Sequence, residues 1–244
     1  CHQLYTGYAM VGVALAKDLG IEVPEGLTGM HAAVDQHPFQ HRVREQIVPL
    51  IDIRAAGLNH FSWILSINDR RTGEDLYPLF RKRFFELKPE FEPLTRDVFS
   101  AFGLFPIPGD THLSEYLPWM SDTQTKPWDK YNIRLYDWEL FANVREFELD
   151  RMNEMANGNA TIAGLLDTDS EGALEMIENI AGGTTHYHLA ANLPNVGQIA
   201  NLPLDAIVET PVVVNGAGIQ PVHMGVLPEP IAELLRRETT AAQL

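Results

Sequence analysis

Residues 51–67 read IDIRAAGLNHFSWILSI, and this stretch decides the fold class. Apolar and polar residues alternate in 51–56 and again in 61–67, and a period of two predicts a β-strand in each segment. Residues 57–60 lie between the two predicted strands and end on a histidine, His60. A charged turn that contains Gly73 follows the second strand.

Helical patterns take up most of the chain around these strands. Between Tyr5 and Leu19 apolar residues recur at the spacing of a helix, and Gly20 and Pro24 end the pattern. Long helices mixed with a few strands that do not alternate with them predict an α+β domain rather than a doubly wound sheet. Further helices are predicted at Leu76–Leu87, Glu92–Phe102 closed by Gly103, Leu135–Met155, from Asp169 or Ser170 to Gly182, and from Pro230 to the end, and further strands at His188–Ala191 and Ala206–Val214.

The composition fits one domain and excludes several partners. With 244 residues, 45% of them hydrophobic, the chain can bury one substantial core. A formal net charge of -15 speaks against nucleic acid and against anionic membranes, because both need clustered Lys and Arg. No run approaches the roughly 20 apolar residues that span a bilayer. A single cysteine excludes an internal disulfide and suits the reducing cytoplasm.

That cysteine, Cys1, forms one half of a candidate metal site with His60. A thiolate and an imidazole delivered from separate elements are common transition-metal ligands. Taken singly, Cys1 also fits a small buried apolar residue, and His60 also fits a hydrogen-bonded core histidine. The chain begins with Cys1 instead of methionine and enters a helical pattern at once, so we expect it to be a piece of a longer protein.

Two other patterns invite a ligand-binding interpretation. Residues 212–218 resemble a strand that leads into the first two glycines of a dinucleotide fingerprint, but position 221, where the third glycine belongs, is Pro221. We therefore predict a hairpin or bulge there. His31, His37 and His41 fit no common metal-ligand spacing, so we interpret residues 28–49 as an exposed insertion or oligomer contact.

Four segments, taken together and in order, resemble the family-4 glycoside hydrolases. They are Cys1-His2, residues 57–60 (GLNH), residues 109–119 (GDTHLSEYLPW), and the block 192–228 with its Asn-Leu-Pro and Glu-Thr-Pro steps. The family has a plan similar to lactate dehydrogenase, with an N-terminal Rossmann domain and an α+β substrate domain. This chain is similar to the second domain only. The resemblance therefore implies that residues 1–244 are a metal- and substrate-binding C-terminal domain, trimmed at both ends and without the Rossmann domain.

The resemblance also implies an activity and two cofactors. The family is an NAD-dependent exception to the two-carboxylate glycosidase scheme. NAD+ oxidises C3 of the sugar, a base removes the acidified C2 proton, the aglycone leaves C1, and water and hydride then return. A divalent metal, usually Mn2+, polarises the sugar oxygens.

Residue roles follow from the same resemblance. Cys1 and His60 would hold the metal, with Zn2+ or Co2+ as softer competitors for the thiolate. Asp110 would be the base, with Tyr116 as the second choice, although Asp110 also fits a turn or cap residue before a helix that starts near His112. His2 would protonate the leaving group or bind a hydroxyl.

Further residues would contact the substrate or the cofactor. His112 and Glu115, one helical turn apart, would bind the sugar or form a capping pair, and Asn59 would be a third sugar contact. Asn192 and Asn195 would contact sugar or nicotinamide, or else close their own turn.

The predicted substrate is an unphosphorylated α-linked sugar, an α-galactoside first, with an α-galacturonide or α-glucuronide as the alternative. A uronide would need a fixed cation, ideally an arginine, and Thr111 stands where the uronidase branch can show one. We expect a cytoplasmic homo-oligomer, a dimer or a tetramer. The rival functions are a 2-hydroxy-acid dehydrogenase, which Cys1 and His60 disfavour, and a non-catalytic interaction domain.

Overall fold

The computed structural model describes residues 2–23, 43, 45–163 and 172–242, with backbone alone for residues 2–5. The predicted metal ligand Cys1 and the histidines His31, His37 and His41 therefore lie outside the described residues. The helices are α1 (His2–Leu19), α3 (Tyr77–Glu86), α4 (Pro93–Phe102), α5 (Gly109–Tyr116), η3 (a 3-10 turn, Pro118–Met120), α6 (Pro127–Lys130), α7 (Trp138–Ala156), α8 (Ala173–Gly182) and α9 (Glu229–Ala242). The strands are β1 (Ile51–Leu58), β2 (Phe61–Asp69), β3 (Phe105–Pro106), β4 (His186–Pro194), β5 (Ile207–Asn215) and β6 (Gly218–Pro221).

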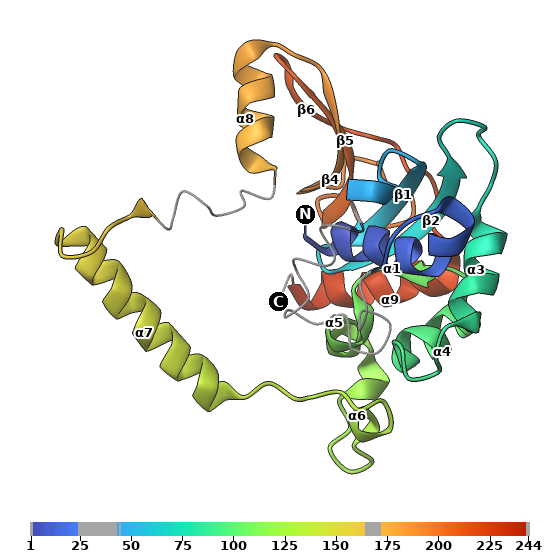
Figure 1. The fold of residues 1–244 in the computed structure, drawn as a ribbon, viewed down its shortest axis with the longest axis horizontal. Helices are drawn as coiled ribbons and strands as arrows, with labels where there is room; N and C mark the ends of the chain where they lie inside the picture. The colour runs from blue at the N-terminus through green and yellow to red at the C-terminus, as the bar shows by residue number, and fades with distance from the viewer. Residues whose placement is uncertain (1, 24–42, 44, 164–171, 243–244) are drawn as a thin grey trace.

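The strands form one sheet in the order β3-β2-β1-β5-β4, with β6 paired to β5 (Figure 1). Every pair among these strands is antiparallel. This arrangement confirms the predicted α+β class, because a doubly wound domain is built on parallel strands. Both strands predicted within residues 51–67 are present and pair with each other.

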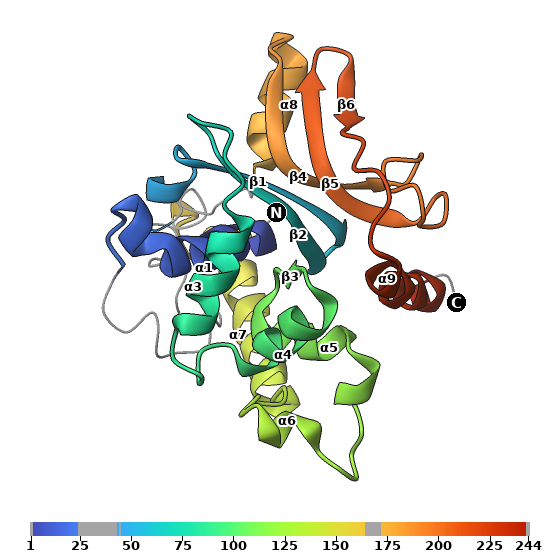
Figure 2. The same cartoon turned by 90° about the vertical axis from the view of Figure 1, so that its right-hand side faces the viewer.

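Helices cover both faces of the sheet, as Figure 2 shows for α1 and α3 on one side and α9 on the other. Side chains of β1 point to both faces of the sheet and join two buried clusters. Ile53 belongs to the cluster with α1 and α3, and Ala56 belongs to the cluster with α4, α5 and α9. A strand between two covered faces must be apolar on both, which explains why Trp63 and Ile64, neighbours on β2, are both fully buried. The buried cluster that contains Ala56 also includes Leu58 and Phe61, so it lies at the end of the sheet that carries the β1–β2 turn.

Several predicted boundaries hold and two shift. Gly103 ends α4 at φ 81°, a conformation that glycine adopts without strain. The predicted helix at 135 begins instead at Trp138, because the Asp137 carboxylate accepts a hydrogen bond from the N–H of Leu140 at 3.0 Å and caps the first turn. The helix predicted near His112 begins at Gly109, so Asp110 lies in its first turn.

The C-terminal part of the chain also follows the prediction. Asn215 to Gly218 connect β5 to β6 as a hairpin, so these glycines form a turn and not a phosphate cradle. The predicted caps of α8, Asp169 and Ser170, lie outside the described residues, and Gly172 at φ 84° precedes the helix. Across the described residues, no helix is both long enough and apolar enough to cross a membrane.

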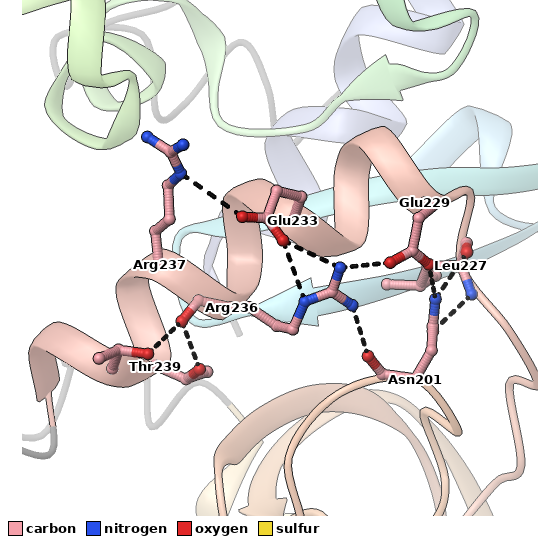
Figure 3. A network of polar contacts seen from close by, with 8 residues as sticks. Asn201, Leu227, Glu229, Glu233, Arg236, Arg237 and Thr239 are labelled. Carbon is pink, nitrogen blue, oxygen red and sulfur yellow. Dashed lines mark hydrogen bonds and ion pairs between the residues drawn. The ribbon is translucent and has the colours of Figure 1, made fainter.

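Arg236 fastens α9 to the loop between β4 and β5 (Figure 3). Its guanidinium donates to the Asn201 carbonyl at 3.0 Å and pairs with Glu229 and with Glu233, the latter at 3.0 Å. The Asn201 side chain in turn exchanges two hydrogen bonds with the backbone of Leu227, at 2.9 and 3.0 Å. These contacts hold the β4–β5 loop against the helix that covers one face of the sheet.

Candidate active site at the β1–β2 turn

Asn59 and His60 form the tight turn between β1 and β2. The strands pair as far as Leu58 opposite Phe61, and His60 has φ 60°, in the left-handed region. Gly57 makes this close approach possible, because a Cβ there would lie 2.4 Å from the Phe61 carbonyl oxygen. The GLNH segment is therefore a turn that presents an imidazole at the end of the sheet.

Helix α5 brings two predicted residues against this turn. The rings of His112 and His60 have their centroids 5.0 Å apart. Tyr116, one turn further along the same face of α5, stacks on Phe61 at 4.9 Å, and its hydroxyl lies 3.4 Å from the Asn59 carbonyl oxygen as donor. The structure thus brings together Asn59 and His60 from the turn and His112 and Tyr116 from α5.

Glu115 completes the cluster from the same helix. Its Oε2 lies 3.0 Å from His112 Nδ1, so the two form a side-chain pair and do not cap the helix. Burial, followed by the neighbouring carboxylate of Glu115, raises the pKa of Tyr136, which donates a hydrogen bond to Glu115. The carboxylate therefore connects α5 to the segment that leads into α7.

The Tyr116 phenol is kept protonated by its surroundings. Burial raises its pKa above the ordinary value, and the carboxylates of Glu115, Glu238 and Glu209 add to the same effect. Near neutral pH a phenol in this setting donates hydrogen bonds.

Asp110 has a different set of partners from the rest of the cluster. Its two carboxylate oxygens accept hydrogen bonds from the N–H groups of Leu94 at 2.9 Å and Thr95 at 2.7 Å, and its own N–H donates to Glu92 at 2.6 Å. The side chain is 1% exposed. Asp110 therefore caps α4, a helix that begins 17 residues before it, rather than the helix to which it belongs.

A buried carboxylate that sequence reasoning missed lies behind the turn. Glu209 on β5 stands opposite Gly57 of β1, and its Oε1 is 3.1 Å from the Ser62 hydroxyl. The same hydroxyl lies 2.9 Å from the Leu58 carbonyl oxygen. The sequence feature that could have pointed to Glu209 is its position as an acidic residue inside the apolar run 207–214, because a buried charge requires a partner.

The two predicted asparagines differ in position. Asn192 on β4 stands opposite Glu209, so Ser62, Glu209 and Asn192 form one polar row across the sheet. Asn195 is fully buried, and its amide group donates to the carbonyls of the β4–β5 loop and accepts from its N–H groups. In this conformation Asn195 closes the loop, which is the second of its two predicted roles.

Only one of the two predicted metal ligands lies among the described residues. Cys1 lies outside them, and so does the side chain of His2. Within the described part of the chain, no three His, Cys, Asp or Glu side chains come close enough together to hold a metal ion. His60 is a partly exposed imidazole, a ligand type that Mn2+ and Zn2+ accept. It therefore fits one position of a metal site.

Comparison with known proteins identifies the family. The family model for the C-terminal domain of family 4 glycosyl hydrolases matches residues 55–244. The chain belongs to this family. The match contains the β1–β2 turn, α5 and the polar row, and it confirms the resemblance inferred from the sequence.

The curated relatives include α-galacturonidases and α-galactosidases. An α-galacturonidase of Bacillus subtilis is 27% identical over 97% of this chain and 50% of its own length. An α-galactosidase of Rhizobium meliloti is 30% identical over 80% of this chain and 43% of its own length. The chain spans about half the length of the curated relatives it matches.

Solved structures agree on the fold. The crystal structure of the Bacillus subtilis glucosidase lplD covers 100% of this chain with a TM-score of 0.71 and 24% identity, and the chain covers 53% of it. A 6-phospho-α-glucosidase from gut microorganisms, in complex with NAD and Mn2+, covers 100% of this chain at a TM-score of 0.56 and 18% identity, and the chain covers 50% of it. The described residues therefore have the fold of the C-terminal part of family-4 enzymes.

Proposed function

We propose that this chain is the metal- and sugar-binding domain of an α-glycosidase that depends on NAD and a divalent metal. The observation that carries the proposal is the cluster of His60, His112, Glu115 and Tyr116 at the β1–β2 turn. The names of the relatives, α-galacturonidase and α-galactosidase, support the reaction class. A 2-hydroxy-acid dehydrogenase is disfavoured because the matched family consists of glycosyl hydrolases.

The chain's own residues would hold and orient the sugar. The side chains of His112 and Glu115 are 25% and 34% exposed, so this pair can exchange hydrogen bonds with sugar hydroxyls. Tyr116 would donate from its protonated phenol, and the exposed Asn192 would contact sugar or nicotinamide from the end of the polar row. When bound, NAD+ would take and return a hydride at C3, while Mn2+ would polarise the sugar oxygens.

His60 and Cys1 would be the protein ligands of the metal. A Mn2+ titration of the 244-residue chain, followed by the electron paramagnetic resonance signal of free Mn2+, tests this directly. We expect His60→Ala to weaken binding tenfold or more, because a site with two protein ligands loses half of them. His223→Ala removes an exposed histidine elsewhere and should leave the titration unchanged. Equal binding by the wild type and His60→Ala would refute the assignment.

Asp110 remains our proposed proton acceptor, and Tyr116 is the weaker candidate. Burial and neighbouring carboxylates keep the Tyr116 phenol protonated, and a protonated group cannot accept the C2 proton. Each Asp110 oxygen already accepts one N–H, but a carboxylate oxygen has a second lone pair available. The Asp110 carboxylate would therefore have to cap α4 and accept the C2 proton of the substrate at the same time.

Hydrolysis in D2O tests the reaction and the base. An active enzyme that contains this chain should yield sugar with deuterium at C2, because the C2 proton leaves and is replaced from solvent. Asp110→Asn should suppress this exchange, and Tyr116→Phe should reduce it less. A product without deuterium at C2 would exclude the oxidation and elimination route altogether.

The substrate class is the neutral α-galactoside, with the α-galacturonide as the alternative. The relatives carry both names, and Thr111 offers no cation for a substrate carboxylate. Parallel assays with aryl α-galactoside and aryl α-galacturonide decide between them, and faster turnover of the uronide would reverse our choice.

A further inference from the structure

We propose that Ser62 and Glu209 are positioning residues that hold the imidazole of His60 in place. This inference rests on the proposed role of His60 as a metal ligand, and it adds two residues that act through His60. The backbone of the β1–β2 turn is in a costly conformation at this histidine. Such a conformation at a functional residue persists only where the surrounding structure enforces it.

The cost arises at His60 itself. Within the Asn59–His60 turn only His60 has a positive φ, 60°. In this left-handed region the Cβ of an L-residue lies too close to the following carbonyl oxygen, so glycine or asparagine usually takes such a turn position. Asn59 stands one residue earlier, and the sequence therefore puts the histidine, not the asparagine, at the strained position. The turn needs contacts that hold it there.

Ser62 holds the turn from one face of the sheet. Its hydroxyl lies 2.9 Å from the carbonyl oxygen of Leu58, the last residue of β1, and 3.1 Å from Oε1 of Glu209 on β5. These contacts link β5, through a side chain of β2, to the residue just before the turn. Gly57 stands opposite both Ser62 and Glu209 and has no side chain, so the two side chains meet across β1.

Tyr116 holds the turn from the opposite face. Successive side chains of a strand point to opposite faces, so Phe61 points away from the side of Ser62. The Tyr116 ring stacks on Phe61 at 4.9 Å, and its hydroxyl lies 3.4 Å from the Asn59 carbonyl oxygen. On the first face Ser62 and Glu209 are only 1% and 2% exposed, so water does not compete with their hydrogen bond. The turn is thus fixed on both faces.

The link between Ser62 and Glu209 depends on a hydrogen bond and not on a charge. The Ser62 hydroxyl has one hydrogen and lies near two oxygens, so it either shares that hydrogen or receives a second one from a protonated Glu209. A glutamine side chain has an oxygen that accepts and an NH2 group that donates. Glu209→Gln should therefore preserve the link in either case, which separates a positioning role from a charge that acts on the metal directly.

A Mn2+ titration of the 244-residue chain, followed by electron paramagnetic resonance, tests the proposal. We expect Ser62→Ala and Glu209→Ala each to raise the Kd for Mn2+ about tenfold, as is typical when a residue that supports a metal ligand is lost. Glu209→Gln should stay close to the wild type. Ser66→Ala is the matched control and should leave the Kd unchanged, because Ser66 lies on the same strand and its buried hydroxyl has no hydrogen-bond partner among the described residues.

Two results of this titration would overturn the proposal. The first is wild-type affinity in either alanine variant while His60→Ala binds weakly, because Ser62 and Glu209 would then not act through His60. The second is a Glu209→Gln variant as weak as Glu209→Ala, because the charge of Glu209 would then act on the metal itself.

Nuclear magnetic resonance reads the turn without metal. The three-bond coupling between the amide and α protons of His60 depends on its φ. We expect this coupling to change in Ser62→Ala and to keep its wild-type value in Ser66→Ala, and Glu209→Ala gives the same reading if Ser62→Ala does not fold. An unchanged coupling would overturn the proposal. If His60→Ala binds Mn2+ as the wild type does, the proposed metal role of His60 fails, and the coupling still decides whether Ser62 and Glu209 hold the turn.

Discussion

At the scale of single residues, one side chain, Asp110, has both a proposed catalytic role and a structural role. Asp110 follows the glycine of the GDTHLSEY segment, where the family resemblance predicts a base, yet both its oxygens cap α4. The sequence could place Asp110 in a loop before a helix, but it could not show the cap, because the two N–H donors lie 15 and 16 residues away. Long-range caps leave no local pattern.

Asp110→Asn should therefore cost stability as well as activity. The amide nitrogen would face an N–H donor, which leaves one buried group without its partner, and such a loss costs about 1 to 3 kcal/mol. Chemical unfolding should show this decrease in the free energy of unfolding, while Asp129→Asn on the exposed α6 should change it by less than about 0.5 kcal/mol. Equal stability of the two variants would show that the cap contributes little.

At the scale of elements, the sequence predicts the long strands and helices that have a clear hydrophobic period, but not the short ones. Residues 51–67 and the helices from Tyr77 and Pro93 match their predictions because alternation and helical spacing run over many residues. The strand β3, two residues long, has no period to detect. The start of α7 depends on one side chain, Asp137, which outweighs the apolar pattern that begins at Leu135.

The contact between α1 and β1 should make stability depend on alkaline pH. The Tyr8 hydroxyl accepts the N–H of Ile53 at 3.2 Å, and burial raises its pKa from the ordinary 10.0 to about 12. Because the folded pKa is the higher one, the contribution is complete below pH 10 and is lost as the pH rises towards 12. At pH 11 the loss is about 1.4 kcal/mol.

Urea unfolding of the wild type and Tyr8→Phe at pH 8 and pH 11 measures this effect. We expect the variant to be less stable at pH 8, because Ile53 loses its acceptor, and to lose about 1.4 kcal/mol less than the wild type between the two pH values. Tyr77 is also buried with a raised pKa, but it is present in both proteins and cancels in the difference. Equal losses would mean that Tyr8 ionises as freely in the folded state as in the unfolded one.

At the scale of the whole molecule, the cluster at the β1–β2 turn belongs to a chain that spans about half the length of its relatives. The family match begins at residue 55, and the relatives are about twice as long as this chain. The sequence could assign the family because its four segments lie in a fixed order. It could not show that Glu209, Ser62 and Asn192 form one row, because that row depends on the pairing of four strands.

The 244-residue chain alone should hydrolyse no glycoside. The proposed reaction begins with hydride transfer, which requires a nicotinamide held against C3 of the sugar. The glycines that resemble a dinucleotide fingerprint lie in the β5–β6 hairpin, where no helix N-terminus is available to bind a pyrophosphate. Incubation with aryl α-galactoside or α-galacturonide, NAD+ and Mn2+ should release no more aryl alcohol than buffer does. Turnover that requires NAD+ would show that these residues bind the dinucleotide themselves, and the chain could then not be a metal- and sugar-binding domain alone.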